Sequence, residues 1–131
     1  MFLTPSYFYV KKKGVRILKE IWKDIKGYEG IYQVSNTGKI RSLDRISSNG
    51  ITAIKGIVMK YGISNSGKGY YQVSLCKNGK PKKVSVHRIV AQTFIPNPKN
   101  LPCVNHKDET RFNNNVENLE WCTHKYNNNY G

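Results

Sequence analysis

The chain has 131 residues, of which 22 are Lys or Arg and 8 are Asp or Glu, so its net charge is +14 and its pI is near 9.8. This length suffices for one domain or for two small lobes, and a balance this basic points to a polyanionic partner. The three cysteines are too few and too scattered for a disulfide framework and fit a reducing, cytoplasmic environment. No apolar run approaches the roughly 20 residues that span a membrane, so we expect no membrane partner.

The positive charge is concentrated in the first two thirds of the chain. Residues 1–86 contain 17 Lys or Arg and 4 Asp or Glu, for a net charge of +13. Residues 87–131 contain 5 Lys or Arg and 4 Asp or Glu, for a net charge of +1. The attraction to phosphate should therefore lie in residues 1–86, although a generally solvated basic surface is the alternative interpretation. Residues 1–19, which include the run Lys11 to Lys13, predict a partly ordered basic arm, either tracking DNA or extending into solvent.

Residues 20–43 predict a hairpin, because alternating apolar and polar residues lie on both sides of an Asn-x-Gly turn at residues 35–38. We expect Trp22, Tyr28 and Ile31 to form a small core. Three basic side chains should stay outside it: Lys39, Arg41 and Arg45.

Residues 46–85 predict further strands over residues 55–60, 70–76 and 82–86. The Asn78-Gly79 pair is a strong hairpin signal between the last two. Residues 64–69 form a polar, glycine-rich loop that lacks the spacing of a phosphate-binding P-loop. Five lysines gather at the predicted loop tips and could track a phosphate backbone: Lys68, Lys77, Lys80, Lys82 and Lys83.

A helix is predicted after Ser85, which can cap it, and Pro96 should end it. Its apolar residues fall on one face, so the helix should pack behind the C-terminal segment as a support: Val86, Ile89, Val90 and Phe94. His87 on this helix is most simply a hydrogen-bonded structural histidine, with a DNA contact as the alternative.

The C-terminal segment combines one Asn-His pair with further asparagines at fixed distances. The pattern predicts a strand over residues 103–106, an Asn-rich loop, a strand over residues 119–122 and a short helix capped by Thr123. Such a unit brings the end of the first strand and one face of the helix around a small site. The imidazole of His106 suits proton transfer near neutral pH, and amide oxygens suit Mg²⁺ or Mn²⁺. We therefore expect metal-assisted hydrolysis.

Three pieces of this segment, VNHKD, NNxVENLEW and THxxNN, resemble the HNH motif of phage and intron-encoded homing endonucleases. The resemblance begins upstream, at residues 86–91 and 94–98, and covers about forty residues. Residues 22–42 also resemble a small motif commonly attached to the N-terminal side of these nucleases, where it contacts DNA. A merely stabilising flap is the alternative role for that unit.

The resemblance implies a metal-dependent endonuclease that hydrolyses phosphodiester bonds of double-stranded DNA in the cytoplasm, which is that of the bacterial host if the chain is phage-encoded. It implies His106 as the general base, Asn105 and Asn127 as ligands of one Mg²⁺ or Mn²⁺, and Asn118 as a brace for the loop. No small-molecule cofactor is expected, and a monomer is favoured.

The sequence departs from the family pattern at two positions. Many relatives have Asp where this chain has Asn105, and Gly where it has Glu109. Two neutral ligands bring no charge to a cation, so we expect weak metal binding without DNA.

The expected fold is α+β, with a basic arm (residues 1–19), an antiparallel β-rich DNA-binding lobe (20–84) and a helix followed by a ββα-metal nuclease domain (85–131). Two other functions stay open. One is a zinc-stabilised module that uses Cys103-x-x-His106 and Cys122-x-His124, although the second spacing is tight for two zinc ligands. The other is a DNA-binding protein without catalysis.

Overall fold

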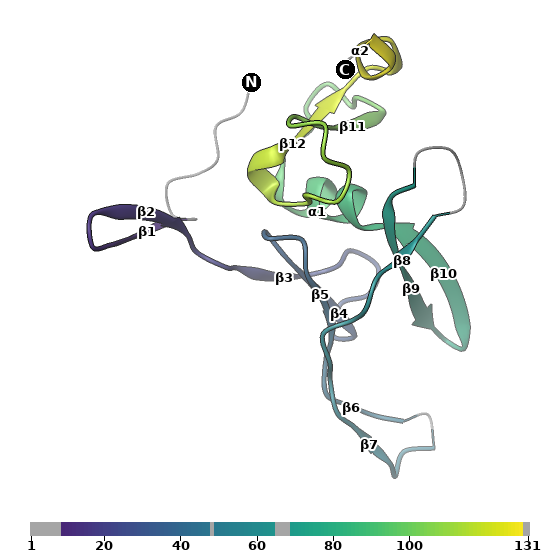
Figure 1. Cartoon of the computed structure of the whole chain (residues 1–131). Helices are drawn as coiled ribbons and strands as arrows, with labels where there is room; N and C mark the ends of the chain where they lie inside the picture. Colours follow the sequence, from purple (N-terminus) through teal and green to yellow (C-terminus); the bar gives the residue numbers. More distant parts are fainter. Residues whose placement is uncertain (1–8, 48, 65–68, 130–131) are drawn as a thin grey trace.

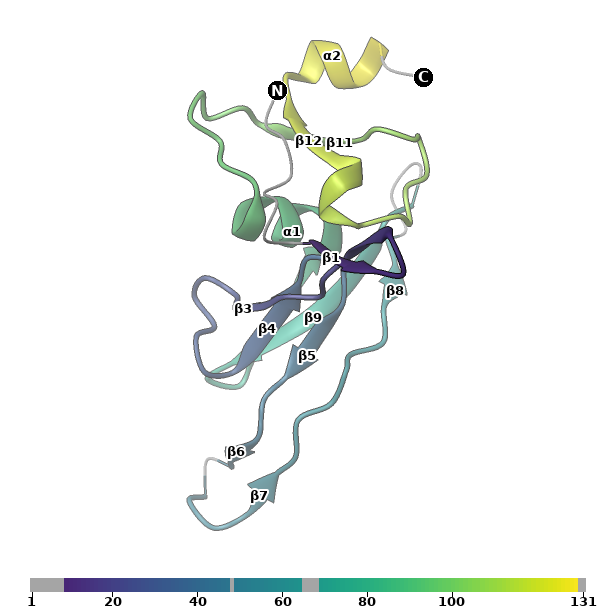
Figure 2. The same ribbon diagram turned by 90° about the vertical axis from the view of Figure 1, so that its left-hand side faces the viewer.

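The computed structural model describes residues 9–47, 49–64 and 69–129. Within these residues strands predominate over two α-helices, α1 (Val86–Phe94) and α2 (His124–Asn129), so the predicted α+β class is confirmed. The molecule is elongated. Helix α2 lies with β11 (Cys103–His106) and β12 (Leu119–Cys122) at one end, and β6 (Arg45–Ile46) and β7 (Ala53–Ile54) project at the other (Figures 1 and 2). Neither α1 nor α2 has the length and apolar character needed to cross a membrane.

Helix α1 is the element around which the rest of the described chain packs. Its buried residues recur at helical spacing: Val86, Ile89, Val90, Ala91 and Phe94. The helix contacts β11, β12, β4 (Tyr32–Ser35), β9 (Tyr71–Lys77), β10 (Lys80–Ser85) and the 3-10 turn η2 (Val116–Asn118). It ends at Phe94, because Ile95 precedes a proline and is extended.

The predicted capping bond of Ser85 is wrong. Ser85 does occupy the N-cap position of α1, but its side chain makes no capping hydrogen bond. The reason is that Ser85 is still the last residue of β10, paired with Gln72 of β9, so the strand runs directly into the helix.

The N-terminal residues form two small antiparallel units. Strands β1 (Tyr9–Lys12) and β2 (Val15–Leu18) make a hairpin, so the described part of the predicted arm is a strand pair. Residues 1–8 lie outside the described residues. Strands β3 (Trp22–Asp24), β4 and β5 (Ile40–Ser42) form a sheet in that order, and the predicted hairpin is confirmed as β4–β5, with residues 36–39 between the strands.

The predicted core of this sheet needs correction at Trp22. Tyr28 and Ile31 do pack against the core, but Trp22 is only half-buried and lies beneath the guanidinium of Arg41, 4.1 Å from the ring centroid. Arg41 also donates to Gln33 Oε1, at 2.6 Å from Nη2. Arg41 is therefore half-buried rather than free outside the sheet, because a guanidinium stacks well on an indole face.

The strand predicted over residues 55–60 is also wrong. These residues form one isolated bridge, between Val58 and Arg41, and the paired segments nearby are β6 and β7. The segment runs so close to the end of β5 that a Cβ placed on Gly56 would lie 2.2 Å from the carbonyl oxygen of Ser42. Two backbone hydrogen bonds flank the bridge, from the Ser42 N–H to the Ile57 carbonyl and from the Met59 N–H to the Ile40 carbonyl, and the pairing extends no further.

Strands β8 (Gly62–Ile63), β9 and β10 form a second three-stranded sheet in the order β10-β9-β8. The predicted strands over residues 70–76 and 82–86 and the turn between them are confirmed, with φ angles of 53° at Asn78 and 74° at Gly79. Positive φ at both central residues is the turn geometry that an Asn-Gly pair favours. Lys68 lies outside the described residues.

One continuous hydrophobic core joins these pieces. It runs from Ile25, Val34 and Ile40 through Val73 and Leu75 to α1, and on to Val104 and Leu119 in the C-terminal hairpin. The N-terminal sheet and the C-terminal hairpin therefore share their interior. The boundaries predicted at residues 19/20 and 84/85 stay predictions.

Candidate functional site

The β11–β12 hairpin positions the Asn-His pair at its end. Asn105 lies opposite Glu120, and His106 opposite Leu119. Asn105 and His106 are the last two residues of β11. Asn105 Nδ2 donates to Glu120 Oε1 at 3.0 Å, and no donor among the described residues bonds to Asn105 Oδ1. Both predicted residues are buried, yet Asn105 keeps one acceptor oxygen that no described residue engages.

The imidazole of His106 is held by Asn114, from the loop that follows β11. Nε2 of His106 lies 2.8 Å from Oδ1 of Asn114, and both side chains are buried. An amide oxygen only accepts hydrogen bonds, so Nε2 carries the ring proton and Nδ1 keeps its lone pair. Burial lowers the pKa of His106, against smaller opposing effects from the Asn114 bond and the Asp108 carboxylate. His106 is therefore neutral near pH 7, the form that accepts a proton.

Two further rings surround His106. Tyr70 stacks on it, with centroids 6.0 Å apart and planes at 16°, and His87 of α1 lies 5.1 Å away. His87 also contacts Tyr70 at 4.8 Å. Burial, followed by the charges of His106 and Arg88, lowers the pKa of His87 to about 3. His87 is thus a neutral ring in an aromatic cluster, and within the described residues it has ring contacts instead of the predicted hydrogen bond.

The loop from Lys107 to Asn118 is closed by the side chain of Asn118. Its Oδ1 accepts from the backbone N–H of Asp108, and its Nδ2 donates to Asp108 Oδ1 and to the carbonyl of Asn113, all at 2.9 Å. The bonds from Asn113 and the Thr110 backbone lower the pKa of Asp108, which keeps this carboxylate ionised. These contacts match the bracing predicted for Asn118; its part in a reaction stays a prediction.

Glu109 occupies a left-handed backbone conformation in this loop, with φ of 63°. Its N–H donates to the carbonyl of His106 at 2.9 Å, which closes a tight turn directly after the strand. Glycine adopts this conformation at no steric cost, which explains in physical terms why a Gly at this position suits the family pattern.

Helix α2 carries Asn127. The predicted cap is confirmed, since Thr123 Oγ1 accepts from the N–H of Tyr126 at 3.1 Å. The helix contacts β11, so Asn127 and Asn105 lie on two elements that touch. Cys103 Sγ, on the same strand as Asn105, lies 3.0 Å from His124 Nδ1 at the start of α2 and links the two elements further.

The zinc-stabilised alternative is not supported. Among the residues that the structure describes, no three His, Cys, Asp or Glu side chains come together in a way that could hold a metal ion. Cys103 contacts His124, whereas His106 faces Asn114. Cys122 is buried, and this burial raises the pKa of its thiol to about 11.

The predicted phosphate-contacting cations differ in whether their charged groups already bind another group of the protein. Lys80, Lys82 and Lys83 on β10 are exposed, and so is Arg45 at the start of β6. Lys39 Nζ lies 3.9 Å from Glu20 in an exposed ion pair, and Lys77 Nζ donates to the carbonyl of Gly27 at 2.8 Å. The β10 lysines are thus the most available cluster among the described cations of this set.

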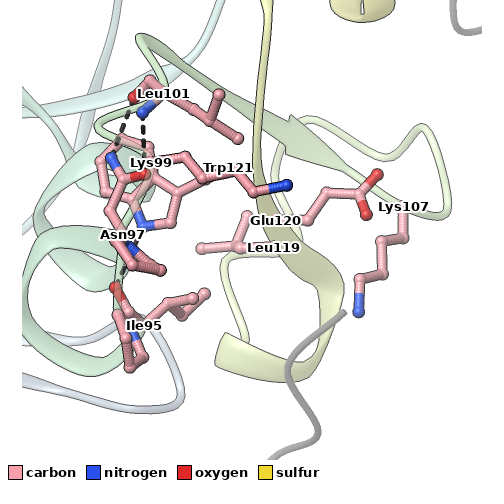
Figure 3. Close-up of a pocket in the computed structure, with 10 residues that line it drawn as sticks. Ile95, Asn97, Lys99, Leu101, Lys107, Leu119, Glu120 and Trp121 are labelled. Atoms are coloured by element: carbon pink, nitrogen blue, oxygen red, sulfur yellow. Dashed lines mark hydrogen bonds between the residues drawn. The ribbon is translucent and has the colours of Figure 1, made fainter.

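A cavity of about 290 Å³ lies beside β12, and its lining includes Glu120, the hydrogen-bond partner of Asn105 (Figure 3). Trp121 Nε1 donates to the carbonyl of Ile95 at 3.0 Å on its wall, and Asn97 exchanges two hydrogen bonds with Leu101. None of the predicted site residues lines this cavity. We interpret it as part of the packing between β12 and the 95–101 connector.

Residues 20–76 match the NUMOD4 motif. Over 109 residues the chain is 42% identical to an uncharacterized HNH endonuclease, L245, of Acanthamoeba polyphaga mimivirus, and over 106 residues it is 42% identical to the DNA endonuclease I-HmuI of Bacillus phage SP01. The chain is a homologue of HNH endonucleases. This confirms the resemblance predicted from the sequence.

A solved structure of one of these relatives is also similar to this chain. The solved structure titled "DNA binding and cleavage by the HNH homing endonuclease I-HmuI" superposes with a TM-score of 0.65 over 82% of this chain and 55% of that one, at 42% identity. The chain spans 54% of the I-HmuI sequence and 29% of the mimivirus relative. As an HNH homologue it therefore corresponds to about half, or less, of these relatives.

Three residues of this HNH homologue's site were not predicted from its sequence: Tyr70, Asn114 and Glu120. Glu120 could have been found from strand register, because pairing His106 with Leu119 places it opposite Asn105. Asn114 lies in a run of three asparagines whose members do not differ by type. Tyr70 is distant in sequence and had no local signal.

Proposed function

We propose that this chain is a divalent-metal-dependent DNA endonuclease of the HNH type. The observation that carries the proposal is the buried, neutral imidazole of His106, which keeps its Nδ1 lone pair at the end of β11 next to Asn105. Homologues named as DNA endonucleases support the hydrolysis of DNA, and HNH endonucleases as a family use a divalent metal.

The donor set fits a hard cation such as Mg²⁺ or Mn²⁺. Asn105 Oδ1 accepts no hydrogen bond from the part of the chain that the structure describes and could coordinate, and Asn127 stands on the helix that contacts β11. Glu120, bonded to Asn105, adds a negative charge that the two amides lack. When bound, the cation would offset charge on the scissile phosphate and on the leaving oxygen. His106 Nδ1 would take the proton of the attacking water, and Asn118 would keep the loop closed.

The exposed cations of the β-rich part would bind the phosphate backbone of double-stranded DNA: Lys39, Arg45, Lys77, Lys80, Lys82 and Lys83, with half-buried Arg41 in support. Their charge is separate from the nearly neutral C-terminal part, so binding and chemistry should be separable by substitution.

A plasmid assay tests the proposal. Supercoiled plasmid incubated with the full chain and Mg²⁺ should be nicked or linearised, and EDTA should stop the reaction. DNA binding without cleavage at any Mg²⁺ or Mn²⁺ concentration would contradict the proposal and favour the non-catalytic alternative.

A further inference from the structure

The turn of the β4–β5 hairpin touches the loop that holds the imidazole. The N–H of Val116 donates to the carbonyl of Asn36 at 2.8 Å. Asn36 is fully buried, and its side chain accepts from the N–H of Ile21 and donates to the carbonyl of Lys19, both at 2.8 Å. The turn is thereby fixed both to its own motif and to the C-terminal loop.

Gly38 of this turn lies directly against Asn114. A Cβ placed on Gly38 would lie 2.9 Å from Asn114 Cβ and 3.0 Å from the Asn114 carbonyl oxygen. Gly38 has φ of 93°, and its carbonyl accepts a hydrogen bond from the hydroxyl of Tyr61. Gly38 therefore forms a flat backbone wall directly behind the residue that bonds to His106 Nε2.

We propose that Asn114 is a positioning residue for His106, and that the Gly38 turn of the NUMOD4 motif holds Asn114 in place. The inference rests on the proposed function, in which His106 is the base. Asn114 acts through His106 and needs no contact with DNA or metal. The NUMOD4 motif thus contributes a wall of the nuclease site in addition to any contact with DNA.

The physical reason is the choice of ring tautomer. An imidazole can carry its proton on either nitrogen, and the acceptor facing one nitrogen decides which. Asn114 Oδ1 at 2.8 Å from Nε2 places the proton there and leaves Nδ1 as the acceptor. The rings of Tyr70 and His87 restrict rotation of His106 but offer no hydrogen bond that selects a nitrogen.

The tautomer can be read directly by ¹⁵N NMR of the full chain with labelled histidine, because the chain has only three histidines. At a pH where His106 is neutral, the wild type should show a protonated Nε2 and an unprotonated Nδ1. Asn114→Ala should give a mixture of tautomers. Its single-turnover rate constant for cleavage should fall about 10- to 100-fold, and its DNA affinity should not change. Asn114→Asp keeps an acceptor oxygen and should restore the tautomer and most of the rate.

Matched variants separate this role from general destabilisation. Asn115→Ala removes the neighbouring amide, which bonds to Asn113 and not to His106, and should leave the tautomer and kcat as in the wild type. Gly38→Ala should disturb the His106 tautomer, whereas Gly30→Ala, with a similar φ of 78° but no atom within 4 Å of its added Cβ, should not. Thermal melting of each variant identifies any that are unfolded.

A wild-type tautomer in both Asn114→Ala and Gly38→Ala would overturn the inference, whatever their activity. A failure of the proposed function has a different signature, namely cleavage by His106→Ala at the wild-type rate. The spectra test the positioning role even in that case.

Discussion

The two parts of the molecule use polar residues in opposite ways. In the C-terminal part the polar residues are buried and bonded: Asn105, His106, Asn114 and Asn118. In the β-rich part most of the predicted DNA-contacting cations are exposed, and the β10 lysines show this best. Burial fixes geometry at the cost of desolvation, whereas exposure leaves charge free to meet phosphate. One part is therefore built for positioning and the other for attraction.

The two parts are not independent folding units, however. They share a hydrophobic core around α1, and the Gly38 turn lies against the loop that holds His106. The separation of roles is a separation of side chains on one framework. Tests of it should therefore use substitutions in the full chain rather than fragments.

The largest effect is expected at His106. His106→Ala should lower cleavage by about 10²- to 10⁴-fold, the range typical for loss of a general base. DNA binding, measured by fluorescence anisotropy on an uncleaved duplex, should stay within about twofold, because the cations lie elsewhere. Parallel loss of binding and cleavage would mean that His106 supports the fold instead.

A large effect on stability is expected from His87. In the folded protein its pKa is about 3, so the ring stays neutral until the pH falls to about that value. In the unfolded chain a histidine takes up a proton near pH 6.5. The unfolded state thus binds more protons as pH falls, so His87 should lower the free energy of unfolding by about 1.4 kcal/mol per pH unit between pH 6.5 and 3.

His87→Phe keeps a ring in the cluster but cannot titrate. Urea unfolding at pH 7, 6, 5 and 4 should show a flatter dependence on pH for this variant than for the wild type. Parallel curves for the two proteins would show that His87 is protonated or exposed in the folded state.

The β10 lysines test the attractive part. Replacing Lys80, Lys82 and Lys83 by Ala should weaken binding to duplex DNA roughly 30-fold near 0.1 M salt and reduce the salt-dependence slope by about 2 to 3. The cleavage rate at saturating protein should not change. Lys99→Ala, an exposed cation of the nearly neutral part, is the control and should change the slope by far less. Equal changes in the salt-dependence slope for the two variants would refute the division between an attracting β-rich part and a positioning C-terminal part.

Local signals account for what the sequence predicted well. The Asn78-Gly79 turn, the apolar face of α1 and the Thr123 cap each depend on residues within one element, and all three are present. The chemical roles assigned to residues of the final segment rest on their spacing along the chain and stay predictions.

Tertiary packing accounts for what the sequence missed. Arg41 covers Trp22, which apolar character alone would place in the core. Residues 55–60, whose pattern indicates a strand, make only one isolated bridge to β5. The Asn114 bond to His106 is one of several that an Asn-rich loop can make, and only the folded loop selects it.

Glu120 changes the prediction made for the metal site. The sequence suggested a neutral ligand shell, but Glu120 is bonded to Asn105 at 3.0 Å and brings a carboxylate beside the proposed ligand. Glu120→Gln should raise the Mg²⁺ concentration for half-maximal cleavage roughly tenfold, because Coulomb attraction in a partly desolvated site is lost. The double substitution Asn105→Asp with Glu120→Gln restores one negative charge and one hydrogen bond. It should return the Mg²⁺ concentration for half-maximal cleavage to the wild-type value. An unchanged requirement in Glu120→Gln would place the cation away from this pair.

The smallest effect is expected at Glu109, where the positioning part of the molecule holds a strained backbone. A φ of 63° is costly for a residue with a Cβ. The Glu109 side chain is exposed, so its replacement changes the backbone strain with little loss of packing. Glu109→Gly should raise the free energy of unfolding by up to about 1 kcal/mol, since relief of strain outweighs the added entropy of the unfolded chain. Glu117→Gly removes the same charge from the exposed face of η2, where the backbone is helical, and should destabilise the protein instead. Urea denaturation with an unchanged m-value would measure both. If the two glycines destabilised the protein equally, Glu109 would carry no strain, and the tight turn after His106 would owe its shape to the Asn118 bonds alone.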